Sequence, residues 1–329
     1  MLSRLLAIPH LQVSQDVPLS GLTRFELGGP AAVLADASTE QALVQAMEVL
    51  RESDTPWTLI GGGSNLVVDD AGFPGVVLRY TGSRIEIDGQ QVRVEAGARL
   101  QDLVDQTIAH GLKGLETMTG IPGWVGGAIY GNAGAYGHSI DERVKWVRFF
   151  EGHSLLDIDN TACEFRYRES VFKQHKEWVV VSAVLQLEPG QPETLQAAAD
   201  EILKVRNAKY PPSMRCAGSI FKNLILKELS PEVQALVPPQ LVREGKVPSA
   251  YFLEQAGAKG MQEGGVRVAD YHANLIYNEG GGASKDVRNL IDRLKSRVHD
   301  RFGLMLEEEI QYIGAGDGPG VSVRARVVI

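Results

Sequence analysis

Apolar residues recur at helical spacing in several stretches of this 329-residue chain, and short apolar or alternating runs lie between them. Residues 39–50 repeat apolar positions every three or four residues, and Thr39 is a candidate N-cap. The same pattern predicts helices over 100–111, 193–207, 250–256 and 284–302, the last with Ser284 as N-cap. Strands are predicted over 31–35, 57–60, 76–80, 85–87, 91–96, 144–150, 178–187, 273–278 and 309–313.

The order of these elements divides the chain into units. A strand, a helix and a strand follow one another up to about residue 75, and alternating strands then dominate up to the break that begins at Pro189. A linking helix precedes a separate α+β unit that ends near residue 305. We therefore expect units at 1–75, 76–205 and 206–305, followed by a C-terminal segment at 306–329.

Composition narrows the possible partners. With 44% hydrophobic and 22% charged residues, the chain has the make-up of an ordinary globular protein. Its net charge of −8 and its lack of a long basic run argue against nucleic acid and acidic membrane surfaces as partners. No run of about 18 apolar residues occurs, and the apolar start is too short for a signal peptide, so we expect a cytoplasmic protein without membrane insertion.

Cysteine and histidine usage argues against metal sites and disulfide scaffolds. Cys163 and Cys216 are the two cysteines, and they lack C-x-x-C spacing, so we expect both to be reduced. The seven histidines form neither H-x-x-x-H nor H-E-x-x-H. We therefore expect no metal.

Two glycine-rich segments carry the clearest chemical signal. Residues 61–66 directly follow a predicted buried strand, and seven glycines fall within the eighteen residues 120–137. Neither helix nor strand accounts for that density, because each interior glycine costs up to about 1 kcal/mol relative to alanine. Glycine lets backbone N–H groups approach an anion closely, so the pattern indicates a dinucleotide cofactor.

The common dinucleotide and phosphate motifs do not fit these segments. The residues after Gly63 lack the third glycine of the Rossmann fingerprint and are typical of a strand that ends in an acidic turn at Asp69 and Asp70. No Gly-Lys-Ser/Thr of the phosphate loop follows either. The sequence thus indicates a dinucleotide site of another kind.

A series of motifs in fixed order covers nearly the whole chain. They are Gly28-Gly29-Pro30, the segments 61–66 and 120–128, Asn132-Ala133-Gly134-Ala135, Tyr167-Arg168-Glu169-Ser170, the segment 218–223, Gly257-Ala258-Lys259-Gly260, His272-Ala273-Asn274 and Leu306-Glu307-Glu308-Glu309. In this order the chain resembles the UDP-N-acetylenolpyruvoylglucosamine reductases, in the shorter branch that lacks an extra tyrosine-bearing loop.

The resemblance implies a fold for each unit. It is the α+β, FAD-binding fold shared with vanillyl-alcohol oxidase and p-cresol methylhydroxylase. Residues 1–75 and 76–205 would be the two FAD-binding subdomains, and residues 206–305 the substrate-binding domain. The segment 306–329 would return to the active site and the FAD domain.

The resemblance also implies a reaction and its cofactors. NADPH reduces FAD, and reduced FAD passes a hydride to the enolpyruvyl β carbon of UDP-N-acetylglucosamine enolpyruvate, which gives UDP-N-acetylmuramate for peptidoglycan synthesis. FAD is expected to be noncovalent, because neither glycine segment contains histidine or cysteine and His138 comes just after the second. The expected cofactor-binding residues are Gly61, Gly62, Gly63, Ser64, Asn65, Leu66, Gly120, Ile121, Pro122, Gly123, Gly126, Gly127, Ala128, Asn132 and Gly134.

Three residues match the family's catalytic positions. Ser219 would give a proton to the enolate-like intermediate, Arg168 would pair with the substrate carboxylate, and Glu309 would also act on that carboxylate. A planar guanidinium suits both oxygens of a carboxylate and their growing charge. Counting back from the strand that follows favours Glu309 over Glu307 and Glu308.

Five further residues are candidates for binding the uridine diphosphate and the sugar of the substrate. These are Lys222, Asn223, Lys259, His272 and Asn274, since lysine suits a diphosphate and asparagine can hydrogen-bond uracil.

The chain departs from the family at Arg24, where threonine is common, and at Leu224, where proline is usual. We expect a monomer. Two alternatives stay open, namely another FAD-dependent oxidase or dehydrogenase of this fold and an FAD-binding protein without catalysis.

Overall fold

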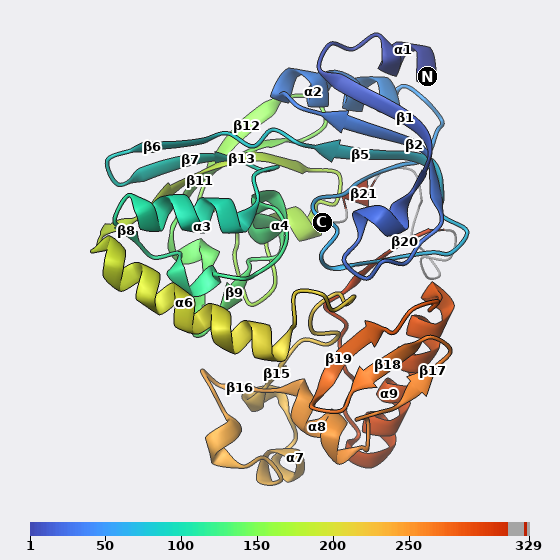
Figure 1. Ribbon diagram of the computed structural model, residues 1–329, viewed down its shortest axis with the longest axis vertical. Helices are drawn as coiled ribbons and strands as arrows, with labels where there is room; N and C mark the ends of the chain where they lie inside the picture. Colours follow the sequence, from blue (N-terminus) through green and yellow to red (C-terminus); the bar gives the residue numbers. More distant parts are fainter. Residues whose placement is uncertain (315–325, 328–329) are drawn as a thin grey trace.

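The computed structural model describes residues 1–314 and 326–327 and has a mixed α+β architecture. Two five-stranded sheets form the upper part of the molecule in Figure 1, and a smaller α+β unit, coloured orange to red, lies below them. Most of the helices and strands expected from the hydrophobic pattern are confirmed. Within the described residues, no helix combines the length with the apolar character that crossing a membrane requires.

The first sheet combines antiparallel and parallel pairing. Its strands are, in spatial order, β1 (Leu11–Pro18), β2 (Pro30–Ala37), β5 (Phe73–Tyr80), β3 (Trp57–Leu59) and β21 (Arg326–Val327). β1 and β2 pair antiparallel, whereas the β2, β5, β3 and β21 neighbours pair parallel. α1 (Leu2–Leu6) and α2 (Glu40–Arg51) accompany this sheet, and the Thr39 hydroxyl accepts a hydrogen bond from the backbone N–H of Ala42, as the expected N-cap does.

The second sheet is antiparallel throughout. Its strands are, in order, β12 (Leu155–Asp159), β11 (Val144–Phe150), β13 (Val179–Gln186), β7 (Gln91–Glu95) and β6 (Ile85–Asp88). α3 (Leu100–Ala109) and α4 (Val125–Tyr130) pack on one side of it, and α6 (Pro192–Lys209) lies against α3 (Figure 1). Shorter elements nearby are β8 (Leu112–Lys113), β9 (Gly134–Ala135), β10 (His138–Ser139), β14 (Glu188–Pro189) and α5 (Val171–Gln174).

One hydrophobic core joins the two sheets. It contains residues from Leu5 to Ala199, including Leu78 of the first sheet and Phe149 of the second. The expected boundary after residue 75 falls inside β5, which is bonded to β2 and β3 along its length, so the first sheet extends to Tyr80. The division into two FAD-binding subdomains stays a prediction.

The lower unit has a core of its own. A three-stranded antiparallel sheet of β17 (Gln262–Glu263), β18 (Val266–Ala269) and β19 (His272–Asn278) packs against α8 (Ser249–Gln255) and α9 (Ser284–Phe302). Its buried side chains include Phe252, Ile276 and Leu294. The unit also holds the short elements α7 (Pro231–Ala235), β15 (Leu224–Ile225) and β16 (Lys246–Val247).

After α9 the chain returns to the upper part. β20 (Gln311–Ile313) pairs parallel with β4 (Leu66–Val68), the short strand that follows the first glycine segment. This return was expected for the segment 306–329, of which the structure describes 306–314 and 326–327; the rest of that expectation lies outside the described residues.

A carboxylate clamp holds α9 against the turn after β4. The Oδ1 and Oδ2 atoms of Asp70 accept hydrogen bonds from the backbone N–H of Ser284 at 2.9 and 3.0 Å, and Oδ2 also accepts one from its hydroxyl at 2.8 Å. The expectation that Ser284 is the N-cap is wrong, because Ala283 holds that position with an extended backbone. The Ser284 side chain serves the junction between the two parts instead.

Replacing Asp70 by alanine removes every one of these acceptors. We expect Asp70→Ala to lower the free energy of unfolding by about 1–2 kcal/mol, the usual effect of losing a helix cap with charge-assisted bonds. Chemical denaturation measures this change. Asp54→Ala is the control, because Asp54 is also exposed and makes no hydrogen bond to the described residues; an equal loss in both variants would contradict the clamp.

Candidate functional site

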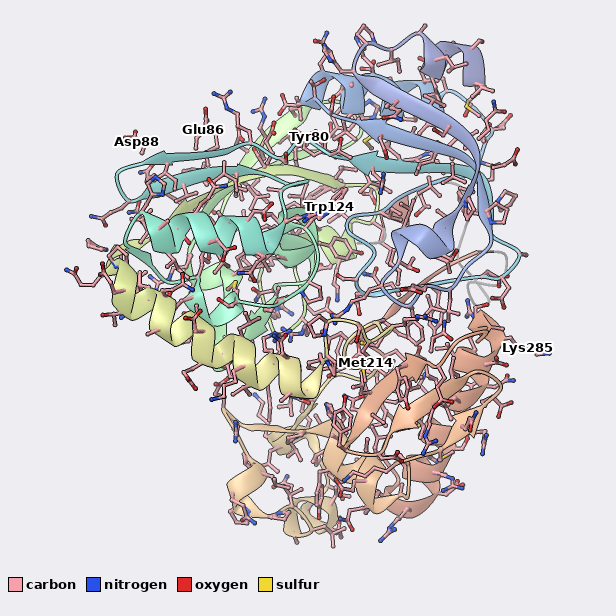
Figure 2. The ribbon with its side chains drawn as sticks, viewed as in Figure 1. Tyr80, Glu86, Asp88, Trp124, Met214 and Lys285 are labelled. Carbon is pink, nitrogen blue, oxygen red and sulfur yellow. The ribbon has the colours of Figure 1, made fainter. Side chains whose placement is uncertain are left out.

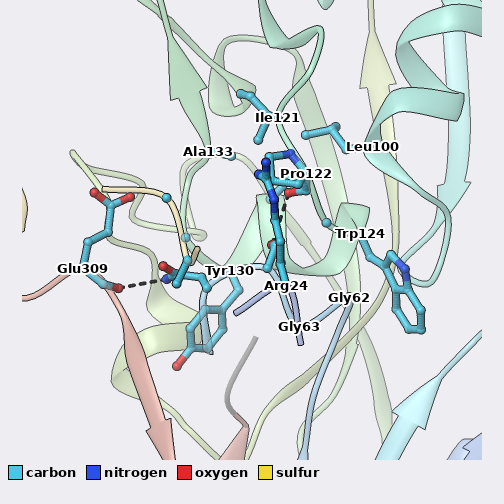
Figure 3. A pocket seen from close by; sticks show the side chains of 18 of the residues that line it. Arg24, Gly62, Gly63, Leu100, Ile121, Pro122, Trp124, Tyr130, Ala133 and Glu309 are labelled. Carbon is cyan, nitrogen blue, oxygen red and sulfur yellow. Dashed lines mark hydrogen bonds between the residues drawn. The ribbon is translucent and has the colours of Figure 1, made fainter. Parts of the chain in front are cut away.

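The two glycine segments meet in space. The hydroxyl of Ser64 donates a hydrogen bond to the carbonyl oxygen of Pro122 at 3.2 Å, across 58 positions of sequence. A Cβ atom on Gly62 would lie 3.0 Å from the Trp124 ring. Figure 3 shows Gly62, Gly63, Pro122 and Trp124 around one hollow, and Figure 2 places Trp124 inside the upper part of the molecule.

Position 63 requires glycine because the backbone of Leu22 lies against it. Its φ of +65° lies in the left-handed region, and a Cβ atom there would stand 1.9 Å from the carbonyl oxygen of Leu22. The Gly63 carbonyl also accepts a hydrogen bond from the backbone N–H of Arg24. The first turn is therefore held at a fixed distance from residues 22–24.

The first turn offers hydrogen-bond donors to a ligand. Within the described part of the chain, the backbone N–H groups of Gly61, Gly62, Gly63, Ser64 and Asn65 find no protein acceptor. Successive N–H groups of this kind in a turn form a concave binding site for an anion such as a diphosphate. The turn therefore fits the diphosphate of a dinucleotide.

A cavity continues from the two turns to the lower unit. It encloses about 1170 Å³, its solvent-open mouth included, and both glycine segments contribute to its wall. Among the described residues, its charged lining consists of Arg24, Arg168, Lys173 and Arg206, with Glu309 as the acidic member. Although the whole chain carries a charge of −8, this cavity is locally basic and suits an anionic ligand.

Arg206 adds a second sign of an anion site. It lies near the end of α6 and lines the cavity, and burial together with the neighbouring Arg24 lowers the pKa of its guanidinium. Its buried Nε has no hydrogen-bond partner among the described residues. A negatively charged ligand would satisfy that donor.

Arg168 and Glu309 form an ion pair in the wall of the cavity. The Arg168 Nε donates to Glu309 Oε1 at 2.7 Å, and Figure 3 shows Glu309 at the edge of the hollow. Further bonds run from Arg168 Nη2 to the Gly134 carbonyl at 3.0 Å and from Nη1 to the Asn132 carbonyl at 3.4 Å. Three anchors thus fix the plane of the guanidinium group.

The backbone at Arg168 is strained, and a buried lysine supports it. Its φ of +58° lies in the left-handed region, which a residue with a long side chain rarely occupies. The ammonium group of Lys173 donates to the Arg168 carbonyl oxygen at 2.6 Å, and burial lowers the pKa of this lysine. Lys173 is therefore a positioning residue for Arg168.

The three consecutive glutamates have different surroundings. Glu307 is exposed and pairs with Lys222, and Glu308 pairs with Lys295 and accepts from the Tyr312 hydroxyl. Glu309 alone of the three lines the cavity. The alternating directions of successive side chains explain why the middle glutamate points away from it.

Ser219 lies in the same cavity on an extended segment. The backbone N–H of Ile220 donates to the Asn274 carbonyl at 3.1 Å, and the N–H of Glu309 donates to the Ile220 carbonyl at 2.8 Å. The Ser219 hydroxyl is 2.9 Å from the hydroxyl of Tyr210, the residue that follows α6. The structure thus brings Arg168, Ser219 and Glu309 to one cavity.

The expected cofactor-binding residues divide into two groups. Those that line the cavity are Gly62, Gly63, Ser64, Asn65, Ile121, Pro122, Gly123, Gly127, Ala128 and Gly134. The others, Gly61, Leu66, Gly120, Gly126 and Asn132, are not part of this lining. Asn132, for example, is buried and donates to the Arg166 carbonyl at 3.0 Å. Their roles toward the cofactor stay predictions.

The expected substrate-binding residues lie outside the cavity lining. Lys222 pairs with Glu169 and Glu307, Lys259 pairs with Glu254, and the side-chain oxygen of Asn223 accepts from the Ser249 N–H. The Asn274 amide is fully occupied, because it accepts from the Phe221 N–H at 2.9 Å and donates to the Phe221 carbonyl and the Ser249 hydroxyl, each at 2.8 Å. Asn274 therefore positions the segment that carries Ser219.

Burial explains why the imidazole of His272 is uncharged. Desolvation, and then the charges of Lys209 and Lys259, lower the pKa of its imidazole to about 4, so it is neutral near pH 7. Its Nε2 is buried and has no partner among the described residues. His272 stands beside Tyr210, with ring centroids 6.1 Å apart.

Sequence reasoning missed several residues of the cavity. Arg24, Trp124, Lys173, Arg206, Tyr210 and Gln311 line it as well. Their spacing along the chain gives no periodic signal, since widely separated segments contribute them. The basic residues could have been sought as counter-charges for an anionic ligand in an acidic chain, but sequence alone does not distinguish them from surface cations.

Comparison with known proteins identifies the family. The chain is 55% identical over 311 residues to UDP-N-acetylenolpyruvoylglucosamine reductase of Solibacter usitatus, with 94% of this chain and all of that protein covered. The chain belongs to the UDP-N-acetylenolpyruvoylglucosamine reductase family. The protein of that name from Bacillus subtilis is 35% identical over 306 residues, with 92% and 94% of the two chains covered.

Domain and structure comparisons agree with this assignment. Residues 210–313 match the C-terminal domain of UDP-N-acetylenolpyruvoylglucosamine reductase, and residues 30–153 match an FAD binding domain. The crystal structure of the Thermus caldophilus reductase superposes with a TM-score of 0.73 at 28% identity, over 92% of this chain and all of that one. The expected fold class and FAD cofactor are confirmed, and the chain is an FAD-dependent oxidoreductase of this family.

The Gly63 contact generates a test of the FAD site. We expect Gly63→Ala to lose bound flavin, because the new methyl group would force the turn away from Leu22. Flavin absorbance per protein after purification measures this. Gly89→Ala is the matched control, since Gly89 has a similar φ of +57° but open space around it; it should cost roughly the 1–2 kcal/mol of a left-handed residue and keep its flavin. Normal flavin content in Gly63→Ala would contradict the assignment.

Proposed function

We propose that this enzyme reduces UDP-N-acetylglucosamine enolpyruvate to UDP-N-acetylmuramate with NADPH, in peptidoglycan precursor synthesis in the cytoplasm, and acts as a monomer. The observation that carries the proposal is the convergence of Arg168, Ser219 and Glu309 on a basic cavity that also holds the glycine turns. The names of the relatives supply the substrate class. When bound, FAD supplies the hydride chemistry.

The first glycine turn and the rest of the cavity would bind different parts of the ligands. The backbone N–H groups of residues 61–65 would hold the FAD diphosphate, and the pairing of Ser64 with Pro122 keeps the second glycine segment beside them. With the first boundary moved from residue 75 to the end of β5 at Tyr80, residues 1–80 and 81–205 would be the FAD-binding subdomains, and 206–305 would cover the substrate. The basic residues Arg24 and Arg206 fit an anionic partner in the space between.

Arg168 would bind the substrate carboxylate. A guanidinium has five N–H donors, and three of them are used by Glu309, Gly134 and Asn132. One N–H on each terminal nitrogen is left to face a carboxylate. As the double bond is reduced, negative charge grows on that carboxylate, and a rigid, prealigned cation stabilises it without reorganising.

Glu309 would set the orientation of the Arg168 guanidinium group. Its Oε1 fixes Arg168 Nε, and its own backbone is fixed by the N–H bond to the Ile220 carbonyl and by the Asn65 amide, which donates to the Glu309 carbonyl at 2.9 Å. A glutamate held in this way keeps the guanidinium plane constant during the reaction.

Ser219 would donate the proton that completes the reduction. Its hydroxyl lies in the cavity, and the backbone on either side is held by Asn274 and Glu309. The proton leaves Oγ and forms the new C–H bond on the carbon next to the carboxylate. Arg168 supports this step, because it stabilises the charge until the proton arrives.

We expect FAD to be noncovalent. Among the described residues that line the cavity there is no histidine or cysteine to form a covalent link, and both cysteines are buried. Acid precipitation should leave the yellow colour in the supernatant. A pellet that stays yellow after washing would contradict the prediction and would favour the covalent flavin oxidases.

Ser219→Ala tests the catalytic assignment. Reduction of the flavin by NADPH needs no proton from serine and should stay nearly normal, whereas reoxidation by the enolpyruvyl substrate should slow roughly 10²- to 10⁴-fold, the usual effect of losing a general acid. Stopped-flow absorbance follows both half-reactions separately. Ser219→Cys should recover part of the second rate.

Ser249→Ala is the control for local damage. It removes a buried hydroxyl that bonds Asn274 behind the Ser219 segment, but it does not reach the cavity. Equal slowing of both half-reactions in Ser219→Ala and Ser249→Ala would mean that the serine shapes the site only. An enzyme whose flavin is never reoxidised by the enolpyruvyl substrate would instead be another oxidoreductase or a non-catalytic FAD protein.

A further inference from the structure

Tyr210 is the partner of the proposed proton donor. Its hydroxyl oxygen lies 2.9 Å from Ser219 Oγ, and both side chains line the cavity. Resting on the function proposed above, we propose that Tyr210 is a proton relay that restores the proton of Ser219 through this hydrogen bond. It acts through Ser219 and does not itself touch the substrate.

The need for a relay follows from the chemistry of serine. When Ser219 gives its proton to carbon, the Oγ–H bond breaks and the C–H bond forms, which without a partner would leave an alkoxide on Oγ. An alkoxide is a far stronger base than a phenolate, so a phenol hydrogen-bonded to Oγ passes its proton across in the same step. The Tyr210 O–H bond breaks, the Ser219 Oγ–H bond is restored, and water later protonates the phenolate.

Two cationic side chains lie beside the Tyr210 ring. The Lys209 ammonium lies 5.1 Å and the Arg206 guanidinium 5.8 Å from the centroid of its ring. The other nearby ring, His272, is neutral near pH 7, so it adds no competing positive proton donor.

A structural role alone explains the contact less well. The backbone at Ser219 is already fixed by the Ile220 and Asn274 bonds and by the bridge to Leu275 in β19. The Tyr210 ring packs at the edge of a small apolar cluster of Cys216, Ala269 and Leu275, near Met214, which Figure 2 labels at the junction of α6 with the lower unit. The hydroxyl is therefore not needed to hold either residue. Its proposed contribution is the proton that it passes to Ser219.

Tyr210→Phe keeps the ring and removes the relay. We expect normal reduction of the flavin by NADPH and slower reoxidation by UDP-N-acetylglucosamine enolpyruvate, by roughly tenfold or more but less than the 10²- to 10⁴-fold of losing the acid itself. Tyr271→Phe is the matched control, because the Tyr271 hydroxyl donates to the Lys209 carbonyl beside Tyr210 and does not reach Ser219. Both rates should be unchanged in the control.

A proton inventory separates a relay from a packing effect. The hydrogen that reduced flavin transfers also exchanges with D₂O, so it contributes to the inventory of both enzymes. We expect the reoxidation rate to curve downward more strongly with the fraction of D₂O in the wild-type enzyme than in Tyr210→Phe, because the relay adds one exchangeable proton to the step. In a double-mutant cycle, Tyr210→Phe should add little to Ser219→Ala, since the relay acts only through the serine.

Each outcome decides the proposal. Equal curvature of the inventory in the wild-type and Tyr210→Phe enzymes, an unchanged reoxidation rate in Tyr210→Phe, or an additive effect in the Ser219→Ala background would overturn the relay while the reductase function stands. Wild-type enzyme whose flavin is reduced but not reoxidised by the enolpyruvyl substrate would overturn the proposed function and the relay with it.

Discussion

The ion pair between Arg168 and Glu309 is the contact on which the site depends, because it joins two residues that are 141 positions apart and that belong to different parts of the fold. Arg168 comes from the loop before α5, on the side of the second sheet, and Glu309 from the segment that leaves the lower unit. Neither residue alone has a defined direction, since both side chains are long. Together, and with the backbone carbonyls of Asn132 and Gly134 as two further anchors, they hold one planar cation toward the cavity.

A second link ties this pair to the cofactor turn. Asn65, in the first glycine segment, donates from its side-chain amide to the Glu309 carbonyl at 2.9 Å, and its own carbonyl accepts from the backbone N–H of Gln311 at 3.0 Å. The same turn presents the backbone N–H groups that fit a diphosphate. A shift of the turn would therefore move Glu309, and through it the guanidinium of Arg168.

Much of the fold could be predicted from the sequence, because its elements follow local rules. The helix that begins after Thr39 and the strand that runs into Gly61 needed only periodicity and a cap. β1 and the role of Ser284 were not predicted, since the first depends on pairing with β2 and the second on Asp70, 214 positions away. The catalytic candidates came from motif resemblance, whereas Lys173, Arg206 and Tyr210 depend on tertiary contacts that no local pattern encodes.

The return of the chain along β4 also has a consequence for biosynthesis. Glu309 and β20 come after α9, so a nascent chain on the ribosome lacks one wall of the cavity until the whole lower unit has emerged. Apart from β21, the strands of the two upper sheets come before residue 200, and their shared core, which ends at Ala199, can begin to pack much earlier. The enzyme thus gains its complete active site only after Glu309 has emerged, and a chain that stops before Glu309 has no Arg168–Glu309 pair.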